Sequence, residues 1–141
     1  MFRDALKIQP ESAPVLNYLG YMNADRGVHL DEAHSMIEKA VSLDPENGAY
    51  LDSLGWSLYR LNRLDEAEQT LRRALERDGN NAVMLDHLAD TLERRGRLSE
   101  ALGLWNKALT GEDEGEELDR GRVEAKIRAA QSALDAANKN P

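Results

Sequence analysis

The sequence predicts an all-α protein built as a solenoid of helix pairs. Alanine recurs every 34 residues in two series, one at positions 33, 67 and 101 and the other at 40, 74 and 108. Each interval contains two segments whose apolar residues have helical spacing. Helix-favouring Ala, Leu, Glu and Arg are abundant and β-branched residues are scarce, so a sheet is not expected.

A third series of small residues consists of Gly20, Gly55 and Ala89. Its first interval is 35 residues and its second is 34, so the first repeat carries one extra residue, most simply in the loop "GVHL". Short side chains are required where the ridges of two helices cross at an axial distance of about 8–10 Å. The three series therefore mark the crossing points of paired helices.

The second repeat shows the helix pair most clearly. Apolar residues at helical spacing predict one helix over 49–61 and another over 65–77. Between the two helices lies Asn62, which matches Gly27 and Gly96 in the other repeats. Asn and Gly accept the left-handed conformation that closes a helix, so each of these residues is expected to end the first helix of its pair.

The boundaries between repeats follow from stop and start signals. Pro45 ends the first repeat and Gly79 ends the second, and Asn47 and Asn81 then stand where helix N-caps belong. The predicted organisation is listed by range: a half repeat at 1–12, complete repeats at 13–47, 48–81 and 82–115, and a linker with a capping helix at 116–141.

The N-terminal stretch "FRDALKIQPES" matches the second helix of a repeat. Phe2, Leu6 and Pro10 fall 35 residues before Ile37, Val41 and Pro45. Residues 1–12 are therefore interpreted as a half repeat, and truncation of a longer array is the favoured explanation. Without a first helix to cover them, Phe2, Leu6 and Ile8 would be exposed. We expect this segment either to fray or to pair two copies in a weak two-fold homodimer.

The C-terminal segment reads as a charged linker followed by one helix from about residue 118 to 137. Val123, Ile127, Ala130 and Leu134 form a single narrow apolar stripe, and the rest of the helix is polar. This pattern is typical of a helix that caps a repeat array and keeps its outer face in water.

These features resemble the tetratricopeptide repeat (TPR) family, whose unit of 34 residues has an apolar–Leu–Gly region, two Ala in the second helix and a terminal Pro. The matching residues are Leu16, Leu19, Gly20, Ala33, Ile37, Ala40 and Pro45 in the first repeat, Leu51, Leu54, Gly55, Ala67, Leu71 and Ala74 in the second, and Leu85, Leu88, Ala89, Ala101, Trp105 and Ala108 in the third. The resemblance covers residues 2 to 111 and implies a right-handed arc. Gly79 in place of Pro and Ala89 in place of Gly are mild departures.

In this family the first helix of each pair lines a concave surface that binds protein segments, so the resemblance assigns candidate site residues. They are Asn17, Tyr21, Asp25, Asp52, Trp56, Tyr59, Arg60, Asp86, His87, Asp90 and Arg94. The family's basic clamp for a peptide carboxylate is missing, because Tyr21, Ser53 and Val83 are among the residues that replace its polar or basic groups. An alternative remains open for Trp56 and Tyr59, which would then pack between neighbouring first helices.

An aromatic centre bordered by carboxylates favours an apolar or aromatic partner segment that carries Lys or Arg. The expected function is therefore a non-enzymatic protein-interaction scaffold that binds a peptide or a partner protein in its groove. The alternative is a self-association module of a larger TPR protein.

Composition excludes several other classes of function. The 141 residues carry a net charge of −8, which disfavours nucleic acid and anionic membranes as partners. With no Cys there is no disulfide or thiolate zinc site, and His34 with Glu38 is too small a set to hold a metal. No catalytic motif and no cofactor loop is present. No export signal or membrane-spanning run is present either, so a cytoplasmic location is the default unless an upstream signal directs a parent protein to the envelope.

Overall fold

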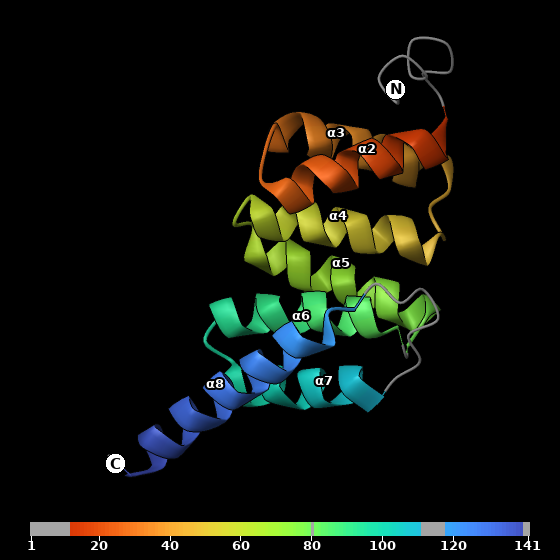
Figure 1. The fold of residues 1–141 in the computed structure, drawn as a ribbon. Helices are drawn as coiled ribbons and strands as arrows, with labels where there is room; N and C mark the ends of the chain where they lie inside the picture. The colour runs from red at the N-terminus through yellow and green to blue at the C-terminus, as the bar shows by residue number, and fades with distance from the viewer. Residues whose placement is uncertain (1–11, 80, 111–117, 140–141) are drawn as a thin grey trace. The chain divides into compact units, whose positions relative to one another are not determined.

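Seven helices and no strand are found in the part of the chain that the computed structural model describes, which is residues 12–79, 81–110 and 118–139 (Figure 1). The helices are distributed over two units, Met1–Asp78 and Gly79–Pro141. None of the described helices is both long and apolar enough to span a bilayer. The predicted all-α helical repeat fold is confirmed. The predicted half repeat, with Phe2, Leu6 and Ile8, lies outside the described residues apart from Ser12.

The N-terminal unit contains two helix pairs. Its helices are α2 (Ala13–Arg26), α3 (Leu30–Leu43), α4 (Gly48–Arg60) and α5 (Leu64–Arg77). Within each pair the two helices pack together, and α4 also packs against both α2 and α3. The helices predicted at 49–61 and 65–77 are α4 and α5, and every end agrees to within one residue.

A left-handed residue closes the first helix of each pair, as predicted. The φ angles are 72° at Gly27, 64° at Asn62 and 83° at Gly96. After each of these residues the next amide N–H donates to the carbonyl five positions earlier, which satisfies an otherwise unpaired helix-end carbonyl. These bonds run from Val28 to Asn23, from Arg63 to Leu58 and from Arg97 to Leu92, at 2.8 to 3.0 Å.

The extra residue of the first repeat is accommodated in the loop where it was expected. Between the left-handed Gly27 and the start of α3 at Leu30 lie Val28 and His29, whereas Arg63 alone separates Asn62 from α5. His29 takes a second left-handed conformation, with φ of 48°. The loop therefore accommodates the extra residue with one additional residue in the left-handed conformation.

Both predicted N-caps are present. The side-chain oxygen of Asn47 accepts a hydrogen bond from the Tyr50 amide at 3.1 Å, and that of Asn81 accepts one from the Met84 amide at 3.1 Å. An Asn at this position satisfies one of the free N–H groups of the first helical turn. The same chemistry therefore starts α4 and α6 (Ala82–Arg94).

Glycine permits the closest approach within each helix pair of the N-terminal unit. A Cβ added to Gly20 would lie 2.5 Å from Cγ1 of Ile37, and one added to Gly55 would lie 2.5 Å from Cγ of Leu71. Real Cβ atoms do not come this close to their neighbours, so any larger residue would push the two helices apart. The predicted role of the small-residue series is confirmed at these two crossings.

The C-terminal unit consists of α6, α7 (Leu98–Thr110) and α8 (Arg120–Lys139), with α7 packed against both of the others. The capping helix begins at Arg120 and not at 118, because Asp119 is its N-cap and accepts a hydrogen bond from the Arg122 amide at 3.1 Å. Val123 and Ala130 of the predicted stripe are buried, while Ile127 and Leu134 are half-buried.

Candidate functional site

In the N-terminal unit, Trp56 of α4 lies against α2. Its indole Nε1 donates a hydrogen bond to Oδ1 of Asp25 at 3.1 Å. Trp56 is only 8% exposed and forms a buried cluster with Ala24 and Ala33. The ring therefore packs between the first helices of adjacent repeats, which is the alternative that the sequence left open for this residue.

Two tyrosines surround Trp56 and keep part of their surface accessible. The ring of Tyr59 stacks on that of Trp56 with a centroid separation of 4.7 Å and an angle of 9° between the planes. Tyr21 and Tyr59 are both half-buried against the cluster that contains Trp56. The three predicted aromatic residues are thus brought together, with Trp56 innermost and the two tyrosines outermost.

The polar residues predicted around this aromatic group have different environments. Asp25 is exposed, whereas Asp52 is buried and does not form part of an open rim. Oδ1 of Asn17 is buried and has no hydrogen-bond partner among the described residues. The Arg60 guanidinium lies beside Gly27, where a Cβ would be 2.5 Å from Nη2. A positive charge at that end of α2 is favourable for the helix dipole.

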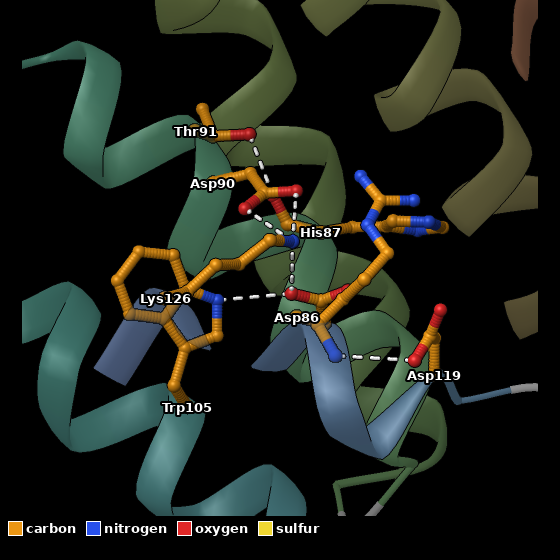
Figure 2. A network of polar contacts seen from close by, with 8 residues as sticks. Asp86, His87, Asp90, Thr91, Trp105, Asp119 and Lys126 are labelled. Atoms are coloured by element: carbon orange, nitrogen blue, oxygen red, sulfur yellow. Dashed lines mark hydrogen bonds and ion pairs between the residues drawn. The ribbon is translucent and has the colours of Figure 1, made fainter. Parts of the chain in front are cut away.

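In the C-terminal unit, Lys126 of α8 joins two of the predicted carboxylates of α6 (Figure 2). Its Nζ lies 2.9 Å from Oδ1 of Asp86, and 2.9 and 3.1 Å from the two carboxylate oxygens of Asp90. Asp86 and Asp90, called the acid pair below, are therefore not an open rim but are already neutralised in part by a lysine of the same chain. Sequence reasoning missed Lys126 because nothing in its local pattern distinguishes it from other basic residues of α8.

Trp105 of α7 completes this group. Its indole Nε1 donates to Oδ1 of Asp86 at 2.9 Å, and the Lys126 ammonium lies 5.9 Å from the centre of its ring. The sequence assigned Trp105 only to the core, and the side chain is fully buried. A buried indole N–H usually has a hydrogen-bond partner, so the assignment of Trp105 to the core was itself a signal that an acceptor lies nearby.

Burial changes the acidity of Asp90. Desolvation, followed by the nearby negative charge of Asp86, raises the pKa of Asp90 to about 6, although Lys126 and His87 act in the opposite direction. Burial alone would lower the pKa of Lys126, but the charges of Asp90 and Asp86 outweigh it and raise this pKa. The ammonium of Lys126 therefore does not fully offset the effect that burial and Asp86 have on the pKa of Asp90.

The remaining predicted residues of α6 are His87, which is buried, and Arg94, which is exposed. The carbonyl of His87 accepts a hydrogen bond from Oγ1 of Thr91 at 2.9 Å. Each of the predicted side chains thus lies on α2, α4 or α6, and the structure groups them into an aromatic set in the N-terminal unit and an acidic set in the C-terminal unit.

A serine, a histidine and a glutamate also meet in the N-terminal unit. Nδ1 of His34 lies 2.9 Å from Oγ of Ser57, and its Nε2 lies 3.5 Å from Oε1 of Glu38. The Ser57 hydroxyl is fully buried and donates to the carbonyl of Leu54 at 2.8 Å. These contacts join α3 to α4. Within the described ranges no three potential metal ligands converge.

Comparison with known proteins places this architecture. A family profile described as tetratricopeptide repeat matches residues 24–82. A TPR repeat-containing protein of Pseudomonas aeruginosa is 48% identical over 52 residues, which are 37% of this chain. That match spans only 9% of the Pseudomonas protein, so most of the Pseudomonas protein lies outside the match.

Solved structures show the same fold at low identity. The TPR domain of Sgt2 from Aspergillus fumigatus superposes with a TM-score of 0.77 at 16% identity, covering 91% of this chain and 82% of that one. The Yersinia enterocolitica type III secretion translocator chaperone SycD gives 0.73 at 19% identity, covering 94% and 88%. Together with the repeat geometry, these comparisons show that the chain has the tetratricopeptide repeat fold and that its residues 24–82 match the family's profile.

Proposed function

We propose that the chain is a non-enzymatic scaffold that holds a segment of a partner protein on the first helices of its repeats. The general part of this proposal is supported by the fold, which is that of a protein-interaction scaffold, and by a neighbour that is itself a translocator chaperone. The finer part is carried by one observation, the stacked pair of Trp56 and Tyr59 with Tyr21 beside it.

In this proposal the two tyrosines contact the partner, while the buried Trp56 packs against them on the side away from the partner. Tyr21 and Tyr59 are half-buried, so part of each side chain is held by packing and the rest is accessible to a partner. Tyrosines are frequent at binding hot spots because they bury a large area and lose few rotamers. Stacking on the buried Trp56 holds the Tyr59 ring in place before a partner arrives, which lowers the entropic cost of binding.

The proposed partner segment is apolar or aromatic and carries Lys or Arg. The exposed carboxylate of Asp25 lies next to the aromatic group, because it accepts the hydrogen bond of Trp56. The chain as a whole has a net charge of −8, so a basic segment would be attracted at long range. Its association rate should therefore fall as salt is added.

A peptide-display screen against the purified chain tests this proposal. Binding of the selected peptides should weaken about tenfold or more in Tyr59→Ala and in Tyr21→Ala. Tyr50→Ala is the matched control, because Tyr50 is nine residues from Tyr59 and so lies on the opposite side of α4. Trp56→Ala should weaken binding by about 2 kcal/mol or more, but it also removes a buried ring and is less specific. Mostly acidic peptides, or full binding by the double tyrosine variant, would refute the proposal.

Self-association is a second candidate function, and a different observation favours it. Tyr18 and Met22 of α2 are 46% and 36% exposed. Their counterparts 35 residues later are Ser53 and Ser57, which are buried against the preceding helices at 4% and 0% exposure. The first repeat thus exposes large apolar side chains on the face that is buried in the second repeat, and a second copy of the chain could bury them.

Light scattering at micromolar concentration separates the two candidates. If α2 mediates pairing, Tyr18→Glu with Met22→Glu should convert a dimer to a monomer without loss of helix content. Phe2→Glu with Leu6→Glu tests whether the N-terminal segment contributes as the sequence predicted, and a change at Ile8 would extend that test. A strictly monomeric wild-type chain would rule out self-association.

A further inference from the structure

Lys126 presents to α6 the same chemistry that the proposed partner would present. It is a basic side chain on a helix, and its ammonium is within hydrogen-bond distance of both members of the acid pair while lying over the Trp105 ring (Figure 2). By the repeat register, Asp86 and Asp90 belong to the helix face that the family uses for binding. A residue of α8 therefore occupies two candidate partner-binding residues of the C-terminal unit.

The remaining attachment of α8 is narrow. Val123 and Ala130 are its buried stripe residues, and most other side chains of the helix are exposed. At its start, Nη2 of Arg120 donates to the carbonyl of Leu109 at 2.6 Å. The contact of Lys126 with the acid pair is thus a polar attachment of α8 to α6, while the main packing of α8 is against α7.

We propose that α8 is a strap that competes with a lysine-bearing partner segment for the acid pair. This inference rests on the proposed scaffold function and extends it to the C-terminal unit. In the closed state Lys126 occupies Asp86 and Asp90, and in the open state a lysine of the partner takes its place. A ligand whose site is blocked in nine of every ten molecules binds about tenfold more weakly than its intrinsic affinity, so the strap sets a threshold for binding.

The two tryptophans make this testable without knowing the partner. The chain contains Trp56 and Trp105 only, one in each unit, and each donates its indole N–H to an aspartate. Two indole resonances are therefore expected in a ¹⁵N-correlation spectrum. Titration with an acetylated hexalysine amide should shift the Trp105 signal, because displacement of Lys126 changes the charge around Asp86. At the peptide concentration that saturates the acid pair, the Trp56 signal should stay in place.

Variants at Lys126 give the decisive comparison. Lys126→Gln should bind hexalysine about tenfold more tightly than the wild type, whereas Arg128→Gln, which removes the same charge from an exposed position of α8, should not. Lys126→Arg should retain wild-type affinity because it keeps the positive charge. Adding Asp86→Asn and Asp90→Asn to Lys126→Gln should abolish the gain. Equal affinities for the two Gln variants, or a gain that survives loss of the acid pair, would overturn the proposal.

The strap and the proposed site in the N-terminal unit can fail separately. Full binding of the selected peptides by Tyr21→Ala/Tyr59→Ala, with an intact Lys126→Gln effect, would refute the aromatic site and retain the strap. Loss of binding in the tyrosine variants with no Lys126→Gln effect would refute the strap and retain the aromatic site. Melting temperatures of Lys126→Gln and Arg128→Gln that agree would show that the affinity change does not come from unfolding.

Discussion

Trp56 donates its indole N–H to Asp25 at 3.1 Å, which hydrogen-bonds the first helix of the second repeat to the first helix of the repeat before it. The indole is 8% exposed while Asp25 is exposed, so the bond lies at the edge of the packed interior. A hydrogen bond in this position both orients the ring and satisfies a donor that burial would otherwise leave unpaired.

Trp56→Phe should therefore destabilise the N-terminal unit by about 1 kcal/mol or more, because it removes the hydrogen bond and the smaller ring also leaves a void. Asp25→Asn should be close to wild type, since the amide oxygen can still accept, whereas Asp25→Ala should lose about 1 kcal/mol with the hydrogen bond. Urea unfolding measures these differences. The combination of Trp56→Phe with Asp25→Ala should lose less than the sum of the single losses. Full additivity would contradict coupling between the two residues.

Gly55→Ala should destabilise the chain by about 1–3 kcal/mol, because the new Cβ would lie 2.5 Å from Cγ and 2.6 Å from Cδ2 of Leu71. Gly103→Ala is the matched control, since Gly103 is also within a helix and its added Cβ would have no neighbour within 4 Å. That substitution should stabilise by about 0.5–1 kcal/mol through helix propensity. Thermal unfolding that ranks the two variants equally would show that α4 and α5 can separate without cost.

Gly96→Ala tests conformation in the absence of a steric clash. No atom lies within 4 Å of an added Cβ at Gly96, as at Gly103, but the φ angle of Gly96 is 83°. An alanine in this left-handed region costs about 1–2 kcal/mol, so this variant should be destabilised. The opposite signs expected for Gly96→Ala and Gly103→Ala can be checked in one set of denaturant titrations.

Asp90→Asn should change how stability depends on pH. The pKa of Asp90 is about 6 in the folded chain and 3.8 is its ordinary value, so the folded state binds the proton more tightly than the unfolded state. The contribution of this group therefore stabilises the fold increasingly as pH falls from about 7 to about 4, by about 2–3 kcal/mol in total. The charged groups facing it are Asp86, Lys126 and His87.

The measurement is urea unfolding at several pH values between 4 and 7 for wild type and variant. Asp90→Asn should lack the stabilisation on acidification that wild type gains from this group. The free energy of unfolding of wild type should therefore rise relative to that of the variant as pH falls toward 4. Asp135→Asn, at an exposed position of α8, serves as the surface control. Parallel pH profiles for wild type and Asp90→Asn would refute the raised pKa.

Local chemistry allowed the helices and turns to be predicted from the sequence. Helix ends at Asn47, Gly27 and Asn62 depend on hydrogen bonds within a few residues, so the residue types are enough to locate them. The crossings at Gly20 and Gly55 could be predicted because repetition turns a contact between two helices into a periodic signal. The start of the capping helix was missed by two residues because Asp119 was not recognised as its N-cap.

The arrangement of the candidate site was decided by tertiary structure. Lys126 is 36 and 40 residues away from Asp90 and Asp86, and its position depends on the angle at which α8 crosses α7. No repeat relates α8 to an earlier helix, so the periodic signal that located the other contacts is missing there. The sequence by itself determined the helix pairs and placed aromatic and acidic residues on their first helices. Burial of Trp56 and neutralisation of the acid pair by Lys126 were decided only by packing, because both depend on which distant side chains share a low-dielectric interior.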